Sequence, residues 1–385
     1  MNNKTKTKTP LVSLIVNDLA NNGFGRAYLL GRMLEPEFRI EVVGFASGPT
    51  WLPCRKHGWP EKSLPFPRVG KVRRFTKDLA KAAEGDLILL CKPLPLVLDV
   101  GDKIRKMSGR PCILDIDDWE FGWFYPLRFR KLLSLIVRTR GKSNGLLRTW
   151  RAEGRTRQWP VRLVSNRFLQ KRFGGTYIPH ACDTEVLNPV RLSDRAEAGR
   201  RLGLDPKRHW IGFIGSPKPH KGVDILLEAV AALKRKDLGV LIAGADQSDP
   251  EIAMLRSRHE SFMEVRPPFA KEQLGEVLAA VEIVALPQLN LPSNWGQVPA
   301  KVFDAMAMKI PVIASSISDL PEVLEGCGVV VPPGDVPDLS RAIATLIDDP
   351  RRCRELGEAG RKRCVERYSF QVVGERLRRL IRGFC

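Results

Sequence analysis

The chain has 385 residues, 43% of them hydrophobic and 28% charged, and it carries a formal net charge of +20. This is the composition of a soluble globular protein that is long enough for two domains, each with its own core. No apolar run approaches the roughly 20 residues needed to cross a bilayer, which argues against a membrane-spanning helix. The eight cysteines are scattered and include no C-x-x-C pair. We therefore expect free thiols in a reducing compartment and no metal site.

The first part of the chain alternates apolar strands with helices. Its first ten residues, MNNKTKTKTP, lack the apolar segment of a signal peptide, which favours a cytoplasmic protein. Residues 10–19 predict a strand, residues 20–25 (ANNGFG) a glycine-rich loop, and residues 26–35 a helix. Further strands are predicted at residues 40–46, 86–91 and 111–117.

Most of the net charge lies in one segment, residues 126–176. This segment holds 14 Lys and Arg but a single acid, Glu153, which leaves a charge of +13. Leucines, Ile136 and the tryptophans Trp150 and Trp159 are interleaved with the basic residues, a pattern that suits an anionic membrane surface. The alternative is a solvated basic helix packed by its leucines. Nucleic acid is a weaker explanation, because no nucleic-acid-binding motif accompanies the charge.

The second part of the chain repeats the alternation of strand and helix. Strands are predicted at residues 210–215, 239–245, 278–288, 312–315 and 328–333, with a helix over 222–235. Nearly continuous apolar strands separated by helices are typical of parallel sheets covered on both faces. The sequence thus predicts two doubly wound α/β domains that meet near residues 187–195. Ligands of such sheets bind beyond the carboxyl ends of the strands.

Three loops of the second domain carry candidate binding residues. Residues 216–222 (SPKPHKG) lie between Gly215 and Gly222 and hold Lys218 and Lys221, which suit a phosphate, although a surface turn with incidental lysines would look the same. Arg266 follows a short strand and could border a base or ribose, or belong to an ordinary loop. The third loop offers the backbone N–H groups of residues 297–300 and the carboxylate of Asp304, which alternatively only stabilises the dipole of its helix.

These stretches resemble the retaining glycosyltransferases of family 4. The similarity is carried by GFIGSPKPHKGVDILLEAVAAL, by SNWGQVPAKVFDAMAMKIPVIASSISDLPEVL, and by GVVVPPGDVPDLSRAI followed by ERYSF. The resemblance implies a GT-B fold, in which two Rossmann-like domains face a central cleft. It implies an acceptor-side domain over residues 1–187, a nucleotide-sugar-binding domain over 188–367, and a last helix over 368–385 that crosses back to the first domain.

The resemblance also implies roles for single residues. Lys221 matches the lysine that contacts the donor diphosphate, and Asp304 matches the second acid of the E-x7-E motif, which holds the ribose. Gly23 and Gly25 match the glycine loop that faces the donor phosphates. The other donor-binding candidates are Gly215, Lys218, Arg266, Gln297, Val298 and Pro299.

This sequence departs from the family pattern at three places. Gly296 stands where the first motif acid would be, so its contact to the donor sugar is missing or is made by Gln297. Ser216 replaces the usual arginine, which leaves Lys218 as a substitute. No histidine follows the first-domain strand, where DIDDWEFGW supplies Asp115, Asp117 and Asp118 instead.

The predicted function is transfer of a sugar, with retention, from a nucleotide-diphosphate sugar to a glycan or lipid-linked acceptor. Lys221, Lys218 and the amides near Val298 would stabilise the leaving diphosphate without a metal or other cofactor. Asp117 or Asp118 would orient or deprotonate the acceptor hydroxyl, unless the pair only caps a helix. The alternatives are a non-catalytic nucleotide-sugar-binding protein and a basic protein associated with nucleic acid. A peripheral position at the inner face of the membrane would fit the basic segment.

Overall fold

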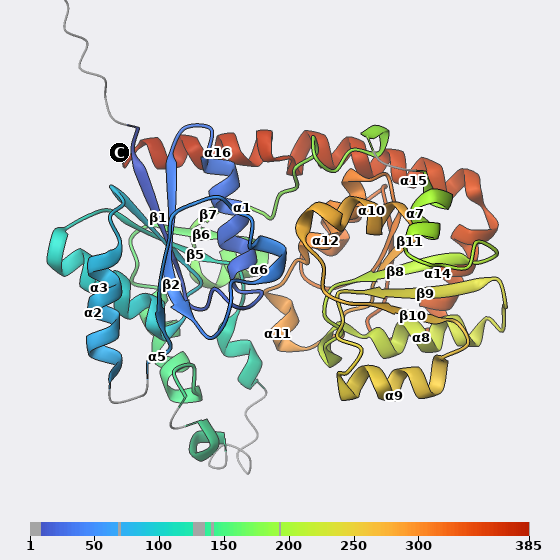
Figure 1. Cartoon of the computed structure of the whole chain (residues 1–385), viewed down its shortest axis with the longest axis horizontal. Helices are drawn as coiled ribbons and strands as arrows, with labels where there is room; N and C mark the ends of the chain where they lie inside the picture. Colours follow the sequence, from blue (N-terminus) through green and yellow to red (C-terminus); the bar gives the residue numbers. More distant parts are fainter. Residues whose placement is uncertain (1–8, 68–70, 126–134, 140–141, 192–193, 385) are drawn as a thin grey trace, which may run out of the picture. The chain divides into compact units, whose positions relative to one another are not determined.

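The computed structural model describes residues 9–67, 71–125, 135–139, 142–191 and 194–384, which form two compact α/β units (Figure 1). Unit 1 contains the chain up to Pro179 together with the segment from Val373 onward, and unit 2 runs from His180 to Val372. The division at Pro179 precedes the expected one at residues 187–188. The predicted α/β class with parallel sheets is confirmed in both units.

The described part of unit 1 contains a parallel sheet with the strand order β3-β2-β1-β4-β5-β6-β7. The central strands β1, β4 and β5 are apolar because both of their faces are covered by the rest of the unit. The strands are β1 (Leu11–Val16), β2 (Arg39–Ala46), β3 (Glu61–Pro65), β4 (Leu87–Cys91), β5 (Cys112–Ile116), β6 (Arg162–Val164) and β7 (Thr176–Tyr177).

The helices of unit 1 begin and end at recognisable sequence signals. Asn166 caps α6 by accepting a hydrogen bond from the N–H of Leu169 at 2.8 Å. Gly109 ends α3 in the left-handed conformation. The helices and short 3-10 turns are α1 (Phe24–Leu34), η1 (Leu52–Cys54), α2 (Val72–Ala82), α3 (Pro95–Ser108), η3 (Glu120–Phe124), α5 (Leu146–Thr156) and α6 (Arg167–Phe173).

A fully buried ion pair joins α1 to β5. The guanidinium of Arg26 contacts the Asp115 carboxylate at 3.0 Å, and both side chains are at most 1% exposed. The same guanidinium donates hydrogen bonds to the main-chain carbonyls of Ile178 (2.7 Å) and Pro179 (3.0 Å). Arg26 therefore holds Ile178 and Pro179 in place, where the chain leaves unit 1 for unit 2.

The chain returns to unit 1 through the second part of α16 (Phe370–Arg382). Arg378 donates a hydrogen bond to the Met33 carbonyl at 2.7 Å, and Arg382 forms an ion pair with Glu37 at 2.6 Å. Leu377 and Ile381 of this helix are fully buried. Unit 1 thus contains two segments that lie far apart in the sequence.

The described part of unit 2 contains a second parallel sheet, in the order β10-β9-β8-β11-β12-β13. Successive residues of its strands face opposite cores: Val240 and Ile242 belong to one apolar cluster and Leu241 to the other. The strands are β8 (His209–Ile214), β9 (Leu238–Ala243), β10 (Met263–Arg266), β11 (Ile283–Leu286), β12 (Val312–Ser315) and β13 (Val329–Val331).

Helices cover both faces of the unit 2 sheet, with α10 and α12 contributing to one core and α8 and α14 to the other. The α-helices are α7 (Arg195–Arg201), α8 (Val223–Ala232), α9 (Pro250–His259), α10 (Leu274–Ala279), α11 (Pro292–Trp295), α12 (Ala300–Ala307), α13 (Leu320–Leu324), α14 (Val336–Asp348) and α15 (Pro350–Arg363). The 3-10 turns are η4 (Pro189–Arg191), η5 (Pro219–Lys221) and η6 (Lys271–Gln273), and η7 (Cys364–Tyr368) is a π-helical turn.

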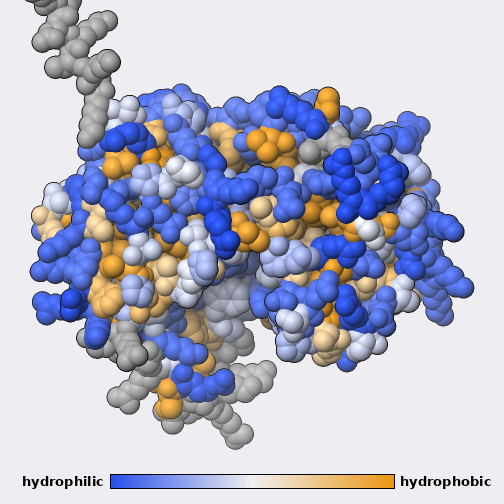
Figure 2. Space-filling model, in the orientation of Figure 1, coloured by the Kyte–Doolittle hydropathy of each residue, from blue (hydrophilic) through white to orange (hydrophobic). Residues whose placement is uncertain are grey.

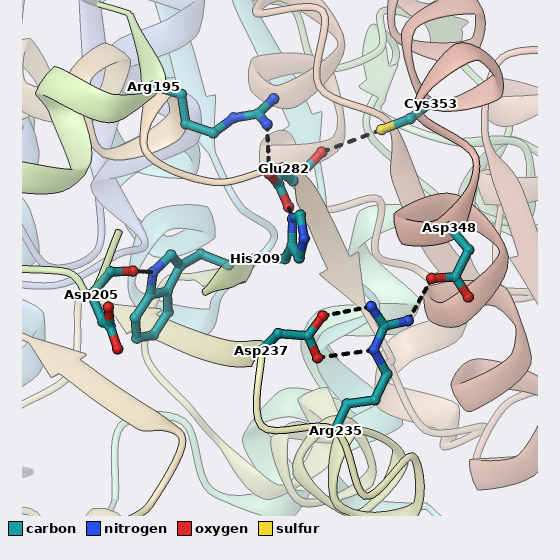
Figure 3. A network of polar contacts seen from close by, with 9 residues as sticks. Arg195, Asp205, His209, Arg235, Asp237, Glu282, Asp348 and Cys353 are labelled. Carbon is teal, nitrogen blue, oxygen red and sulfur yellow. Dashed lines mark hydrogen bonds and ion pairs between the residues drawn. The ribbon is translucent and has the colours of Figure 1, made fainter. Parts of the chain in front are cut away.

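Polar contacts join the amino ends of the unit 2 strands (Figure 3). Glu282, just before β11, accepts from Arg195 at 2.7 Å and contacts His209 of β8 at 2.7 Å. Arg235 bridges Asp237, before β9, and Asp348 of α14 at 2.7 and 2.6 Å. These contacts secure the edge of the sheet opposite to the one where parallel strands present ligand-binding loops.

No helix within the described residues is both long and apolar enough to cross a membrane. The face of the molecule drawn in Figure 2 is mainly hydrophilic, and hydrophobic residues show between the hydrophilic ones.

Replacing Arg26 should destabilise the protein strongly. Arg26→Met leaves the Asp115 carboxylate buried without its cation, which typically costs about 3–5 kcal/mol. Arg32→Met is the matched control on the same helix, because Arg32 pairs with Glu35 near the surface and such pairs contribute about 0–1 kcal/mol. Urea denaturation of the two variants measures the difference. Equal losses of unfolding free energy would contradict the importance assigned to the Arg26 pair.

Candidate functional site

The carboxyl ends of β8, β9 and β10 approach one another closely. The N–H of Gly215 donates to the Ala243 carbonyl at 2.7 Å, and the N–H of Gly244 donates to the Arg266 carbonyl at 3.0 Å. Both glycines have positive φ, and a Cβ on Gly244 would lie 3.2 Å from the Cα of Gly215. Only glycine fits this close approach without strain. The predicted site residue Gly215 therefore lies where backbone from neighbouring loops converges.

The lysine loop, residues 216–222, follows directly. The Lys221 ammonium donates to the Ser216 carbonyl at 2.9 Å and lies 3.3 Å from the Ser216 hydroxyl. Its cation is thereby held over the beginning of its own loop. Lys218, by contrast, is exposed, and its positive charge acts on Glu251 of α9. Of the two predicted phosphate ligands, Lys221 is thus the one that the loop holds in place.

Gly222 ends the loop in the left-handed conformation, with φ of 69°. A Cβ at this position would lie 2.0 Å from the main-chain oxygen of Pro287, which follows β11. The loops after β8 and β11 therefore touch backbone to backbone, and any side chain at this position would separate them.

Asn294 joins the lysine loop to the segment that precedes α12. Its side-chain amide donates to the carbonyls of His220 (2.7 Å) and Leu289 (2.8 Å), and the side chain is fully buried. The Asn294 carbonyl in turn accepts from the N–H of Gln297 at 3.1 Å. The sequence offered no signal for this role, because a single asparagine within a short helix is unremarkable. Asn294 brings Lys221 and Gln297 to the same edge of the sheet.

The start of α12 holds the remaining predicted donor ligands. Pro299 is its N-cap residue, and no side chain caps the helix. Asp304 is 4% exposed and accepts a hydrogen bond from Lys301 at 3.2 Å. Val298 is buried, whereas Gln297 and Pro299 are partly exposed. Asp304 is therefore a buried carboxylate with a cation beside it. It lies in the second turn of α12 and not in the first turn, where stabilisation of the helix dipole was expected to place it.

Two further residues of this edge bear on the site. Gln288, just after β11, is 3% exposed, and no donor among the described residues hydrogen-bonds its side-chain oxygen. Arg266 has its guanidinium engaged with the Leu202 carbonyl at 2.9 Å and with Glu264 at 2.8 Å. Gln288 thus offers an unused acceptor that the sequence gave no reason to select. The Arg266 side chain, a predicted ligand, is occupied within the protein.

In unit 1, the glycine loop between β1 and α1 is held by Asp18. The Asp18 carboxylate accepts from the Ala20 N–H at 3.0 Å, from the Asn21 amide at 2.7 Å and from the Ser47 hydroxyl at 2.8 Å. Gly23 is the N-cap residue of α1, and its N–H donates to the Asn21 side chain at 2.9 Å.

Gly25 lies beneath the ring of Trp51, where an added Cβ would come within 3.3 Å of the indole. The predicted glycine loop therefore leads into the start of a helix, where the N–H groups of Phe24 and Gly25 donate to the carbonyls of Asn21 (3.1 Å) and Asn22 (3.0 Å).

A charged cluster lies beyond the carboxyl ends of β4 and β5. Lys92 donates a hydrogen bond to Asp118 and lies 3.5 Å from Asp117 and 3.9 Å from Glu120. Neither aspartate caps a helix, because the turn η3 has Trp119 as its N-cap and no side-chain cap. The predicted pair Asp117 and Asp118 thus belongs to a buried group of charges, and sequence reasoning missed its lysine.

The surroundings of the cluster hold protons on two of its acids near neutral pH. Burial, together with Asp118 and Asp115, raises the pKa of Asp117 to about 8, against the lowering effect of Lys92. Burial and Asp118 raise the pKa of Glu120 to about 7. Burial alone would lower the pKa of Lys92, but the three carboxylates raise it well above its ordinary value. Asp117 is therefore a carboxyl group that gains and loses its proton in the range useful for acid–base chemistry.

Comparison with known proteins identifies the second unit. A family model described as "Glycosyl transferases group 1" matches residues 208–349, which include Lys221, Asn294 and Asp304. Unit 2 contains a family 4-like glycosyltransferase domain. The predicted family resemblance is confirmed to this extent.

Curated relatives match about half of this chain. A GDP-mannose-dependent monoacylated alpha-(1-6)-phosphatidylinositol monomannoside mannosyltransferase of Corynebacterium glutamicum is 26% identical over 54% of this chain and 56% of its own length. An MMP alpha-(1->4)-mannosyltransferase of Mycolicibacterium hassiacum is 33% identical over 51% of this chain and 50% of its own length. The chain thus spans about half the length of the curated relatives it matches.

Solved structures resemble the whole chain. Sucrose-phosphate synthase from Thermosynechococcus elongatus has a TM-score of 0.73 at 18% identity, covering 97% of this chain and 98% of that one. HepE from Anabaena, in complex with UDP-glucose, has a TM-score of 0.76 at 16% identity, covering 97% and 100%. At such identities the likeness concerns the fold alone. It confirms the predicted GT-B fold around the glycosyltransferase domain.

The contact between Gly222 and Pro287 gives a stability prediction. Gly222→Ala should lower the unfolding free energy by about 2 kcal/mol or more, because a left-handed alanine costs about 1–2 kcal/mol and overpacking adds to it. Gly326→Ala is the matched control, since Gly326 has a φ of 68° but no atom within 4 Å of an added Cβ. Denaturant titration compares the two. Losses of the same size would mean that the loops after β8 and β11 separate at no cost.

Proposed function

We propose that this protein is a glycosyltransferase that moves a sugar from a nucleotide-diphosphate sugar to a hydroxyl group of a glycan or lipid-linked acceptor. The observation that carries the proposal is the link that Asn294 makes between the lysine loop and the segment before α12, within the glycosyltransferase domain. This link places a fixed cation and a helix start at one edge of a parallel sheet. Retention at the anomeric carbon is part of the proposal, on the resemblance to family 4.

The donor diphosphate would be bound by Lys221 and by backbone N–H groups at the start of α12. Breaking the bond between the sugar and the diphosphate leaves negative charge on the phosphate oxygens. The Lys221 ammonium is already held at Ser216, so it can stabilise this negative charge without a large rearrangement. Amides at the start of α12 would add partial positive charge. This arrangement stabilises the leaving group more than the intact donor.

Asp304 would accept hydrogen bonds from the ribose of the donor. Its carboxylate is nearly buried, and Lys301 neutralises part of its charge. Gly296 carries no side chain where the family has its first acid, so the sugar itself would be contacted by other groups, with Gln297 the nearest candidate in sequence. The names of the relatives support this class of donor: one is GDP-mannose-dependent, and one structure contains UDP-glucose.

The acceptor hydroxyl would lose its proton to Asp117. Asp117 is 7% exposed, and no donor among the described residues hydrogen-bonds its Oδ1 atom. Asp118 is less suited, because its carboxylate already accepts a hydrogen bond from Lys92. With a pKa of about 8, Asp117 would act as a base in its ionised form. Transfer should therefore speed up as the pH rises towards 8.

The transfer reaction is best tested on residues of the donor side. Lys221→Ala and Asp304→Asn should each lower transfer about tenfold to hundredfold, since a lost charged hydrogen bond costs about 1.5–3 kcal/mol. Lys236→Ala, an exposed lysine of unit 2, is the control. Product formation is measured with UDP-, GDP- and ADP-sugars, after a thermal-shift screen in which a ligand at 100 times its Kd adds about 2.7 kcal/mol.

Each result of this test has a distinct meaning. Near wild-type transfer in both variants would overturn the assigned donor site. Binding of a nucleotide sugar without transfer or hydrolysis would favour the second candidate, a non-catalytic nucleotide-sugar-binding protein. That candidate is favoured by Gly296, which stands where the family has its first motif acid.

We also propose that transfer needs no metal. The positive charge at the leaving diphosphate would come from Lys221 and backbone amides, and no cluster of metal-ligating side chains occurs among the described residues. Transfer should therefore persist in EDTA at the wild-type rate. Loss of activity in EDTA that manganese restores would show that the charge is supplied by a cation instead.

The acceptor side would dock on an anionic membrane surface. Within the segment 126–176, residues 126–134 and 140–141 lie outside the described residues, but α5 is described. It exposes Leu147, Trp150 and Arg151 together, at positions i, i+3 and i+4, with Trp150 59% exposed. Trp159, by contrast, is buried in the core. An exposed tryptophan beside basic residues favours the interface of a membrane over a purely solvated helix.

Membrane docking is tested by a charge reversal on α5. Leu147→Glu/Arg151→Glu should release the protein from vesicles of anionic lipid, since each basic residue contributes about 1 kcal/mol at such a surface. Met254→Glu/Arg258→Glu makes the same change on the exposed face of α9 in unit 2. Co-sedimentation at low and high salt measures binding. Equal loss in both variants, or equal binding to neutral vesicles, would refute docking through α5.

A further inference from the structure

Lys92 occupies an unusual position at the end of β4. It is the first residue after the strand and has a φ of 72°, in the left-handed region that residues other than glycine seldom enter. Its N–H donates to the Asp115 carbonyl at 3.1 Å, which ties this turn to β5. Residues held in such a conformation cluster at functional sites. The turn directs the Lys92 side chain into the group formed by Asp117, Asp118 and Glu120.

Two cations, Lys92 and Arg26, act on Asp117, and Arg26 is already paired with another carboxylate. The charged or titratable groups that act on Asp117 are Lys92, Asp118, Asp115 and Arg26. Arg26 is held in its ion pair with Asp115 and by two main-chain carbonyls. Lys92 is 15% exposed and contacts carboxylates of three residues. The Lys92 ammonium is therefore the positive charge that offsets the negative charges of Asp117, Asp118 and Glu120.

We propose that Lys92 is a positioning residue that fixes Asp118 and Glu120 around Asp117 and keeps the carboxylate form of Asp117 available to the acceptor hydroxyl. This inference rests on the proposed function. In the reaction, the acceptor O–H bond would break as its oxygen bonds to the sugar carbon, the proton would pass to Asp117, and the electron pair of the broken sugar–phosphate bond would leave with the diphosphate. Lys92 itself would neither bind the sugar nor take the proton.

The sign of the effect follows from the charge. Lys92 favours the ionised form of Asp117, so removing the ammonium should raise the Asp117 pKa above its value of about 8. An opposite charge at this distance typically shifts a carboxyl pKa by about one unit or more. In Lys92→Met, a smaller fraction of Asp117 would be ionised at pH 7, and transfer at that pH should fall about tenfold. The loss should be recovered at higher pH, where Asp117 ionises in the variant as well.

The experiment follows the Asp117 carboxyl carbon directly by NMR titration of protein labelled at aspartate, with Asp117→Asn to assign the signal. Wild type is compared with Lys92→Met, with Lys92→Arg, which keeps the charge, and with Lys234→Met. Lys234 is also left-handed, with φ of 52°, but it is exposed in unit 2. If Lys92→Met does not fold, Lys92→Gly removes the charge while relieving the left-handed backbone. The pH dependence of kcat is measured on the same proteins.

We expect the Asp117 pKa and the acid limb of the kcat profile to move upward together in Lys92→Met, and neither to move in Lys234→Met. Lys92→Arg should stay within a few tenths of a unit of wild type. An unchanged Asp117 pKa in Lys92→Met and Lys92→Gly would overturn the proposal, as would a kcat profile that stays fixed while that pKa rises. If wild type transfers no sugar, the proposed function fails, and the titration alone decides whether Lys92 controls the charge of Asp117.

Discussion

The buried contact between Arg26 and Asp115 is the interaction on which the arrangement of unit 1 depends. A guanidinium and a carboxylate taken fully out of water are tolerable only when each is paired and hydrogen-bonded. Here the guanidinium also satisfies the carbonyls of Ile178 and Pro179, which would otherwise be unpaired where the chain leaves the sheet. One side chain thus aligns α1, β5 and the exit of the chain. The loop that contains Gly23 lies at the start of α1. Asp117, the candidate base, directly follows the end of β5.

The two sheets present chemistry at their carboxyl edges in different ways. In unit 2 the edge is built from backbone: glycines at close approach, carbonyls held by Asn294, and one lysine resting on its own loop. Under the proposed function, the Lys221 ammonium at this edge would bind the donor diphosphate. In unit 1 the edge holds buried acids, and two of them, Asp117 and Glu120, gain and lose a proton near neutral pH. That edge suits a hydroxyl group that must lose a proton.

The parts of the fold that sequence reasoning predicted are those with strong local signals. The apolar runs of β1, β4 and β5 in unit 1 and of β8, β9, β11 and β12 in unit 2 are almost completely buried. Such continuous apolar runs between helices are typical of the strands of a parallel sheet. β3 was missed because it is an edge strand, with alternating exposure and little apolar content. β6 and β7 were missed because they are short and lie within a basic segment. Lys92, Asn294 and Gln288 were missed for another reason: their roles depend on partners distant in sequence. The side-chain contacts of Arg266 with Leu202 and Glu264 could not be foreseen for the same reason.

The return of α16 to unit 1 has a consequence for how the protein is made. Met33 and Glu37 are translated early, but their partners Arg378 and Arg382 follow only after the whole of unit 2. At about 5–20 residues per second, the ribosome needs roughly 10–40 s to make the intervening unit. During that time the apolar surface that receives Leu377 and Ile381 has no helix to cover it. The nascent chain would therefore offer chaperones a binding surface that disappears when α16 is released from the ribosome.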